Sequence, residues 1–150
     1  MQTIWRRQSL VRHLGTMTRT ATLYHNPSCS KSRSAHGILT DYNASREASE
    51  QVDVHVVEYL KTPPDAATIE SLLSMLFPDE VPPNPVRLMR TGNKEFSELH
   101  LDELDPTVED QRQQLIASMV AQPSLIERPI FVKDGRAVIG RPPDRVLELL

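Results

Sequence analysis

The only cysteine of the chain, Cys29, has the side chain best suited to chemistry, because it stands where a short predicted strand is followed by a predicted helix. It lies within the stretch YHNPSCSKSR, residues 24–33. At the start of a helix, unpaired backbone N–H groups and the positive end of the helix dipole favour the thiolate, the form of cysteine that attacks electrophiles. A lone cysteine is more often a small buried apolar side chain. Its place at a helix start leads us to predict that Cys29 is a nucleophile.

Two polar residues precede the cysteine in the same loop. His25 is equally compatible with donating a hydrogen bond to the thiolate and with a local role in capping the loop. Asn26 is a residue type that fixes loop backbone through an Asx turn, so we predict a structural role for it.

Three arginines at the ends of predicted elements could bind an anion. Arg90 ends a short helix, Arg128 comes directly before Pro129 at the start of a strand, and Arg141 lies between a hairpin and the last helix. A guanidinium group suits a tetrahedral oxyanion, because its planar fork stays protonated and makes charge-assisted hydrogen bonds. Taken singly, each arginine is most simply a solvated surface charge or half of an ion pair.

The first predicted elements would position Cys29. Residues 21–24 are predicted to form a short buried strand, and Ser28 is predicted to cap a helix from about residue 29 to 42. Residues 53–59 are rich in β-branched side chains and predict a second strand, parallel to the first because crossover connections are right-handed. The chain therefore opens as β-α-β.

The rest of the chain is predicted to be helical and then to end in a hairpin and a helix. Thr107 resembles the first residue of a capping box, and the Asp134–Gly135 pair predicts a hairpin turn. A last helix up to residue 150 should turn Val146, Leu147 and Leu150 toward the core. The order β-α-β, helices, β-β-α predicts an α/β thioredoxin-like mixed sheet, with a helical insertion between the second and third strands.

In a thioredoxin-like topology, the residue before the third strand lies beside the nucleophile loop and is often followed by a cis proline. We therefore predict a cis bond between Arg128 and Pro129, although only about 5% of X–Pro bonds are cis in general.

Length and composition limit the classes of protein. The chain has 150 residues and a formal net charge of −3, which argues against a general nucleic-acid binder, and it has no apolar run of the roughly 20 residues that cross a bilayer. One cysteine excludes an internal disulfide framework and a cysteine-rich zinc site. We expect a monomer without a bound metal, in the reducing cytoplasm, and no contact with a membrane.

Residues 1–19 differ in composition from the rest, with four arginines and no acidic residue. Such a bias occurs in organellar presequences, but we expect either a disordered extension or a misplaced start, with Met17 as an alternative first residue. Residues 20–150 are then expected to form the domain.

Four motifs together resemble the glutaredoxin-coupled arsenate reductase family. They are YHNPSCSKSR at 24–33, LMR at 88–90, IERPI at 126–130 and IGRPP at 139–143. The resemblance covers about residues 20–150, and it is the ordered combination of the motifs that makes it specific.

This resemblance implies an activity and a set of site residues. Cys29 would attack arsenate, and His25 would match a histidine that helps to keep the cysteine ionised. The arginines that hold the oxyanion would be Arg90, Arg128 and Arg141. Glutathione would be the co-substrate and glutaredoxin the partner, with no bound cofactor. The residues agree with this, because reducing As(V) takes two electrons and a protein with one thiol cannot form its own disulfide.

Two other functions stay open from the sequence. Regulators of the Spx type share this fold and bind RNA polymerase, but their redox switch uses a second cysteine where this chain has Ser32. A monothiol thiol–disulfide oxidoreductase would also use a Cys-x-x-Ser motif, but it would leave the three arginines unexplained.

Overall fold

The computed structural model describes residues 19–150, so the extension predicted at residues 1–19 lies, apart from Arg19, outside the described residues. One mixed sheet of four strands, in the order β2-β1-β3-β4, is formed by β1 (Thr20–His25), β2 (Asp53–Glu58), β3 (Ile130–Lys133) and β4 (Arg136–Ile139). β1 and β2 are parallel, whereas β3 runs antiparallel to both β1 and β4. This is the predicted thioredoxin-like sheet.

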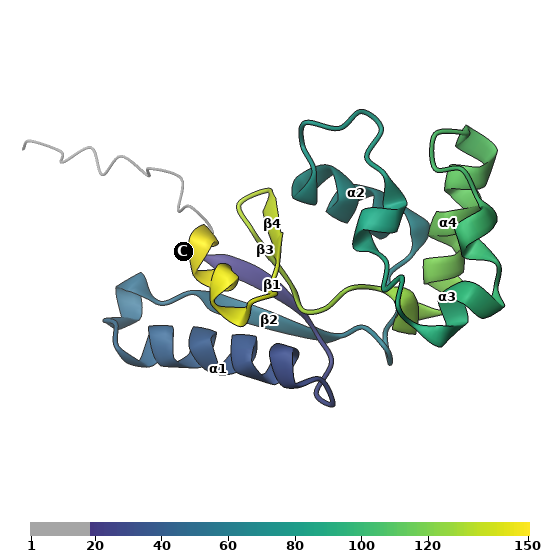
Figure 1. Cartoon of the computed structure of the whole chain (residues 1–150). Coiled ribbons are helices and arrows are strands. Elements are labelled where there is room, and N and C mark those ends of the chain that lie inside the picture. Colours follow the sequence, from purple (N-terminus) through teal and green to yellow (C-terminus); the bar gives the residue numbers. More distant parts are fainter. Residues whose placement is uncertain (1–18) are drawn as a thin grey trace, which may run out of the picture.

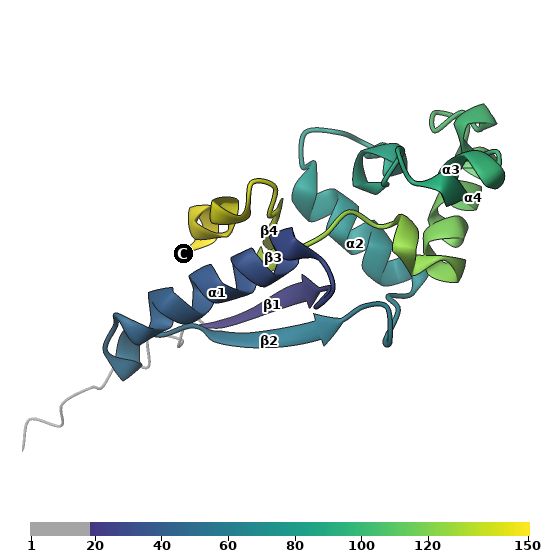
Figure 2. The same cartoon turned by 60° about the horizontal axis from the view of Figure 1, so that its bottom comes forward.

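Helices cover both faces of the sheet (Figures 1 and 2). The α-helices are α1 (Ser30–Ala44), α2 (Ala66–Leu76), α3 (Lys94–Glu98) and α4 (Glu109–Ala121). Short 3-10 helices lie at Ala48–Glu50, Pro85–Leu88, Leu101–Glu103, Pro123–Leu125 and Pro143–Leu149. α1 and the C-terminal 3-10 helix pack together on one face, and α2 packs on the other, with α3 and α4 extending the insertion beyond it.

The alternation of side chains along the strands builds two apolar layers. Leu23 and Phe131 face α1 and the C-terminal helix, and both are fully buried. Tyr24 follows Leu23 in β1, and Ile130 precedes Phe131 in β3. Both point to the opposite face of the sheet and belong to the layer that contains α2 and α4. The sheet therefore carries α1, with Cys29 at its start, on one side and the insertion on the other.

The last helix differs from the prediction in its period. It is a 3-10 helix, in which residues three apart share a face. Val146 and Leu149 are therefore the buried pair, whereas Leu147, predicted to face the core, is 44% exposed. Leu150 is only partly buried.

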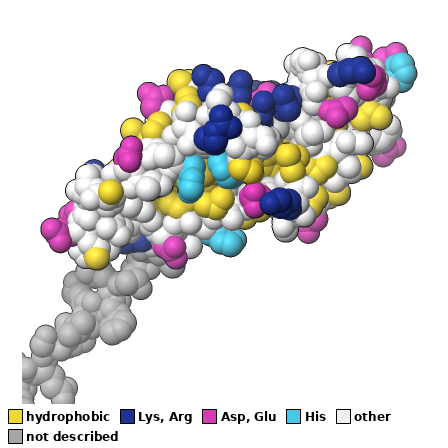
Figure 3. Space-filling model, turned by 90° about the horizontal axis from the view of Figure 1, so that it is seen from below, with side chains coloured by type: hydrophobic (Ala, Val, Ile, Leu, Met, Phe, Trp, Pro, Cys, Tyr) yellow, Lys and Arg dark blue, Asp and Glu magenta, His cyan; other side chains and the backbone are white. Residues whose placement is uncertain are grey.

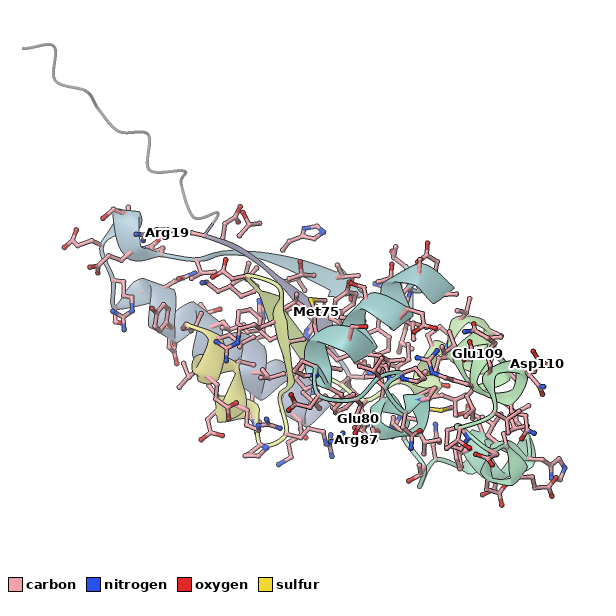
Figure 4. All side chains as sticks on the ribbon, turned by 90° about the horizontal axis from the view of Figure 1, so that it is seen from above. Arg19, Met75, Glu80, Arg87, Glu109 and Asp110 are labelled. Atoms are coloured by element: carbon pink, nitrogen blue, oxygen red, sulfur yellow. The ribbon has the colours of Figure 1, made fainter. Side chains whose placement is uncertain are left out.

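The predicted start of α4 is also wrong by one residue. The Thr107 hydroxyl donates to the Asp105 carboxylate at 2.6 Å instead of capping the helix, and Val108 occupies the N-cap position. The first turn still suits the helix dipole, because Glu109 and Asp110 place negative charge there (Figure 4). Two other helices have side-chain N-caps, because Asp65 accepts a hydrogen bond from the Thr68 N–H and Asn84 accepts one from the Val86 N–H.

Ion pairs hold the insertion together. The Arg112 guanidinium is almost fully buried and binds the Glu70 carboxylate with two hydrogen bonds of 2.7 and 2.8 Å, which joins α4 to α2. This bidentate contact lowers the pKa of Glu70. A more exposed pair, Glu80 and Arg87, closes the loop after α2, and Figure 4 shows the two side chains close together.

Candidate active site

The loop between β1 and α1, which contains the predicted nucleophile Cys29, is folded by its own hydrogen bonds. Asn26 makes an Asx turn, because its side-chain oxygen accepts from the Ser28 N–H at 3.0 Å. The Asn26 backbone accepts from the Cys29 N–H and donates to the Ser32 hydroxyl, both at 3.0 Å. Cys29 itself occupies the N-cap position that was predicted for Ser28. The loop thus places the cysteine at the N-cap of α1, directly before the first helical residue.

The surroundings of Cys29 favour its thiolate. Partial burial works toward a higher pKa, but the backbone N–H groups of Ser32 and Lys31 and the charged side chain of Arg128 outweigh it. The pKa of Cys29 is therefore lowered. The thiol stays partly accessible, as a nucleophile must be.

A short pairing between distant segments brings Arg90 toward Arg128. The backbone N–H of Arg90 donates to the Leu125 carbonyl at 2.7 Å, and that of Glu127 donates to the Leu88 carbonyl at 2.8 Å. Arg128 follows this pairing directly in the chain. The positive charges of Arg90 and Arg128 both act to lower the pKa of one buried phenol, that of Tyr59, so both arginines lie near Tyr59.

The third arginine is positioned by the end of the hairpin. The Arg128–Pro129 bond is cis, as predicted, and so is the bond after Arg141. The Gly140 N–H donates to the Pro129 carbonyl at 2.8 Å, so the residue before Arg141 lies against the proline. A Cβ on Gly140 would stand 2.8 Å from Pro129 Cγ, which requires glycine at this close approach.

Gly140→Ala is expected to push Pro129 out of place and to separate Arg141 from Arg128. The expected cost is about 1–3 kcal/mol in the free energy of unfolding, the usual range for overpacking, together with weaker oxyanion binding. Urea unfolding of the full chain measures the first effect. The matched control is Gly37→Ala in α1, where a Cβ meets nothing within 4 Å and stability should be unchanged or higher. Equal stability of the two variants would contradict the role given to Gly140.

Glu127 lies between two of the arginines, which the sequence reasoning missed. Its Oε2 atom is 4.0 Å from Arg128 Nη1 and 3.8 Å from Arg141 Nε. Within residues 19–150, buried Glu127 Oε2 and buried Arg128 Nε make no hydrogen bond. Arg141 therefore joins the cluster through this carboxylate. The only signal in the sequence was the position of the acid next to Arg128.

Tyr59 is a second site residue that sequence reasoning missed. It is 2% exposed and follows β2 in the chain. Burial raises the pKa of its phenol, and the charges of Arg128 and Arg90 and the Asn26 side chain partly offset this, while Cys29 adds to the rise. Tyr59 is thus a neutral phenol close to the cysteine and two arginines. Tyrosine is common in protein cores, so nothing in the sequence indicated that Tyr59 lies near the site.

His25 ends β1 and is buried. Its ring centre is 5.3 Å from that of His36, and its Nδ1 atom has no hydrogen-bond partner among the residues that the structure describes. Burial, followed by His36 and Arg33, lowers the pKa of His25 against the opposite effect of Glu58. The imidazole is therefore neutral near pH 7 and supplies no positive charge to the thiolate. Its role toward Cys29 stays a prediction.

Seen from below the view of Figure 1, one face of the molecule carries histidine side chains beside hydrophobic and basic ones (Figure 3). In the described part of the chain, no three His, Cys, Asp or Glu side chains are grouped so that they could hold a metal ion. Across residues 19–150, none of the helices has the length and apolar character needed to cross a bilayer.

Comparison with known proteins gives consistent matches. The family model described as ArsC family matches residues 24–149. An uncharacterized protein of Escherichia coli K12, YfgD, is 40% identical over 134 residues, covering 89% of this chain and 99% of its own. An arsenate reductase of Neisseria meningitidis is 31% identical over 128 residues, covering 85% of this chain and 96% of its own.

A solved structure agrees with the sequence matches. The arsenate reductase from Vibrio cholerae superposes with a TM-score of 0.71 at 36% identity, covering 87% of this chain and 98% of that one. The family match spans the loop of Cys29 and all three arginines. On this shared sequence and fold, the protein belongs to the ArsC family.

Proposed function

We propose that this protein reduces arsenate to arsenite through a covalent adduct on Cys29, with glutathione as co-substrate and glutaredoxin as the partner that regenerates the thiol. The observation that carries the proposal is the position of Cys29 at the N-cap of α1, where the backbone N–H groups of Ser32 and Lys31 and the side chain of Arg128 lower its pKa. The names of the relatives from Neisseria meningitidis and Vibrio cholerae support arsenate as the substrate. The reaction consumes reduced thiols, which fits the reducing cytoplasm.

The first step is an attack of the Cys29 thiolate on the arsenic of dihydrogen arsenate. The S–As bond forms as one As–O bond breaks, and hydroxide leaves and takes a proton from solvent. Arsenic stays As(V) in this step. Arg128, with Arg90 and Arg141, neutralises the charge on the remaining oxygens, and charge-assisted hydrogen bonds of this kind stabilise a transition state strongly.

The second step transfers the two electrons. The thiol of glutathione loses its proton and attacks the sulfur of Cys29, so an S–S bond forms and the S–As bond breaks. The electron pair of that bond stays on arsenic, which leaves as arsenite, As(III). Glutaredoxin then removes the glutathionyl group from Cys29 by thiol–disulfide exchange, because no second thiol of this chain can do so.

The Spx-type alternative is less well supported by the surroundings of Ser32. Its side chain is fully buried and accepts a hydrogen bond from the Asn26 backbone, so it anchors the nucleophile loop. This position serves the fold of the loop and not a dithiol switch. Binding to RNA polymerase in a direct pull-down, together with no reductase activity, would favour the regulator.

The proposal is tested by arsenate-dependent oxidation of NADPH in the presence of glutathione, glutathione reductase and glutaredoxin. The full set should consume NADPH only when arsenate is added. Omitting glutaredoxin should leave the protein as a mixed disulfide after one turnover and stop the reaction. Absence of arsenate-dependent oxidation with reduced Cys29 would contradict the proposed activity.

A further inference from the structure

The carboxylate of Glu127 is unexpected in a site proposed to bind anions, because it carries the same sign of charge as the ligand. Glu127 stands within 4.0 Å of the guanidinium groups of Arg128 and Arg141. Its negative charge opposes the repulsion between these two cations, which keeps them close together. The same charge repels any anion that the two arginines attract, so its presence would weaken anion binding unless the anion offered it something in return.

The contacts around Glu127 leave hydrogen-bonding groups open. The distances from Oε2 to both arginines are longer than a hydrogen bond, and neither Oε2 nor the buried Nε of Arg128 has such a bond in the described chain. Although Oε2 itself is buried, the Glu127 side chain keeps 25% of its surface exposed, so part of this side chain can still contact an anion. Two side chains that follow one another in the chain thus contribute one acceptor and one donor without hydrogen-bond partners. Buried groups of this kind are normally satisfied, which indicates a ligand with both functions.

A protonated oxyanion has both functions. Arsenate and phosphate keep at least one hydroxyl group at neutral pH, so they offer a donor as well as negatively charged acceptor oxygens. Sulfate has the same tetrahedral shape and carries no proton at that pH. Toward a hydrogen-bond acceptor such as Glu127, the O–H donor is therefore the property that sets arsenate and phosphate apart from sulfate.

We propose that Glu127 determines specificity by accepting a hydrogen bond from the hydroxyl group of a protonated tetrahedral oxyanion, while Arg128 and Arg141 bind its ionised oxygens. The site then takes arsenate and phosphate and rejects sulfate. This inference rests on the proposed function for the position of the anion, and it adds which anions can enter. Sites built to hydrogen-bond a substrate hydroxyl reject analogues without it by large factors, because the acceptor is left unpaired.

The test measures anion binding without turnover. Bound anion should shield the Cys29 thiolate from alkylation by iodoacetamide, so the slowing of alkylation at rising concentrations of phosphate, arsenate and sulfate gives three apparent dissociation constants. The full chain should bind phosphate and arsenate at least about tenfold more tightly than sulfate, a discrimination well within what one such hydroxyl contact supplies. Equal shielding by phosphate and sulfate, or no shielding by any of the anions, would overturn the proposal.

The variant that tests the residue is Glu127→Gln, which keeps the shape of the side chain and removes its charge. Sulfate should now shield Cys29, and its affinity relative to phosphate should rise about tenfold. The matched control is Glu148→Gln, which removes an exposed carboxylate paired with Arg145 in the C-terminal helix and should leave the ratio unchanged. An unchanged ratio in Glu127→Gln would overturn the proposal.

The two proposals can fail separately. If arsenate shields Cys29 selectively but is not reduced, the proposed reductase activity is wrong and the assignment of Glu127 stands. If arsenate is reduced and sulfate shields as well as phosphate does, the activity stands and the assignment is wrong. The comparison of anions on the unmodified chain does not depend on whether the Glu127 variant folds.

Discussion

Replacing Cys29 with serine is expected to reduce arsenate-dependent NADPH oxidation to background while the fold is retained. A hydroxyl group at this position has a far higher pKa than the thiol and cannot form a mixed disulfide with glutathione, so both steps of the proposed reaction are lost. Serine is among the preferred N-cap residues, so stability should be equal or higher by up to about 1 kcal/mol.

The coupled NADPH assay and urea unfolding together measure these two effects. Ser30→Ala, an exposed change in the next residue of α1, is the matched control and should keep most of the activity. A Cys29→Ser protein that retains a substantial part of the activity would rule out the covalent adduct.

Removing Arg128 is the second large expected effect. Arg128→Ala should raise the pKa of Cys29, because its positive charge is one of the causes that lower this pKa. Alkylation of Cys29 by iodoacetamide as a function of pH measures this directly, since only the thiolate reacts. Its midpoint in the unmodified chain should lie below the ordinary value, and in the variant it should move to higher pH. Loss of one oxyanion donor should also lower kcat/KM for arsenate by about 100- to 1000-fold.

Two further variants separate charge from geometry. Arg128→Lys should restore much of the shift in the alkylation midpoint, but little of kcat/KM, because a lysine cannot make the paired hydrogen bonds of a guanidinium group. Arg46→Ala removes an exposed arginine that stacks on Tyr42 past the C-terminal end of α1, and should change neither quantity. An alkylation midpoint that does not move in Arg128→Ala would show that this arginine does not act on Cys29.

Local signals in the sequence were sufficient for the parts of the fold that depend on neighbouring residues. The hairpin was predicted from Asp134–Gly135, and both residues have the positive φ angles, 52° and 70°, that such a tight turn requires. The β-α-β opening was predicted from one apolar strand, one helix start and one β-branched strand. The same local reasoning placed Cys29 at the beginning of α1.

Predictions that needed a helical period or a cap were less secure. The prediction for the C-terminal helix assumed an α-helical period. The helix has a 3-10 period instead, so Leu149 is buried and Leu147 is exposed. At the start of α4, the Thr107 hydroxyl group donates to the Asp105 carboxylate in a local turn and therefore does not cap the helix.

The composition of the site could be predicted only in part, because its residues come from segments far apart in the chain. Arg90 reaches the site through a backbone pairing with Leu125, and no pattern in the sequence specifies that pairing. Tyrosine is a residue type common in protein cores, and glutamate is one common on protein surfaces, so neither Tyr59 nor Glu127 stood out in the sequence. Only the structure brings Tyr59 close to Arg128 and places Glu127 between Arg128 and Arg141.

The central claim is that Cys29 becomes oxidised by arsenate and glutathione acting together. The most direct measurement is the intact mass of the full chain after incubation with arsenate and glutathione in the absence of glutaredoxin, followed by peptide mapping. The account predicts the addition of one glutathionyl group on Cys29 that requires arsenate and is removed by glutaredoxin. Glutathionylation at the same rate without arsenate, or none with it, would contradict the account.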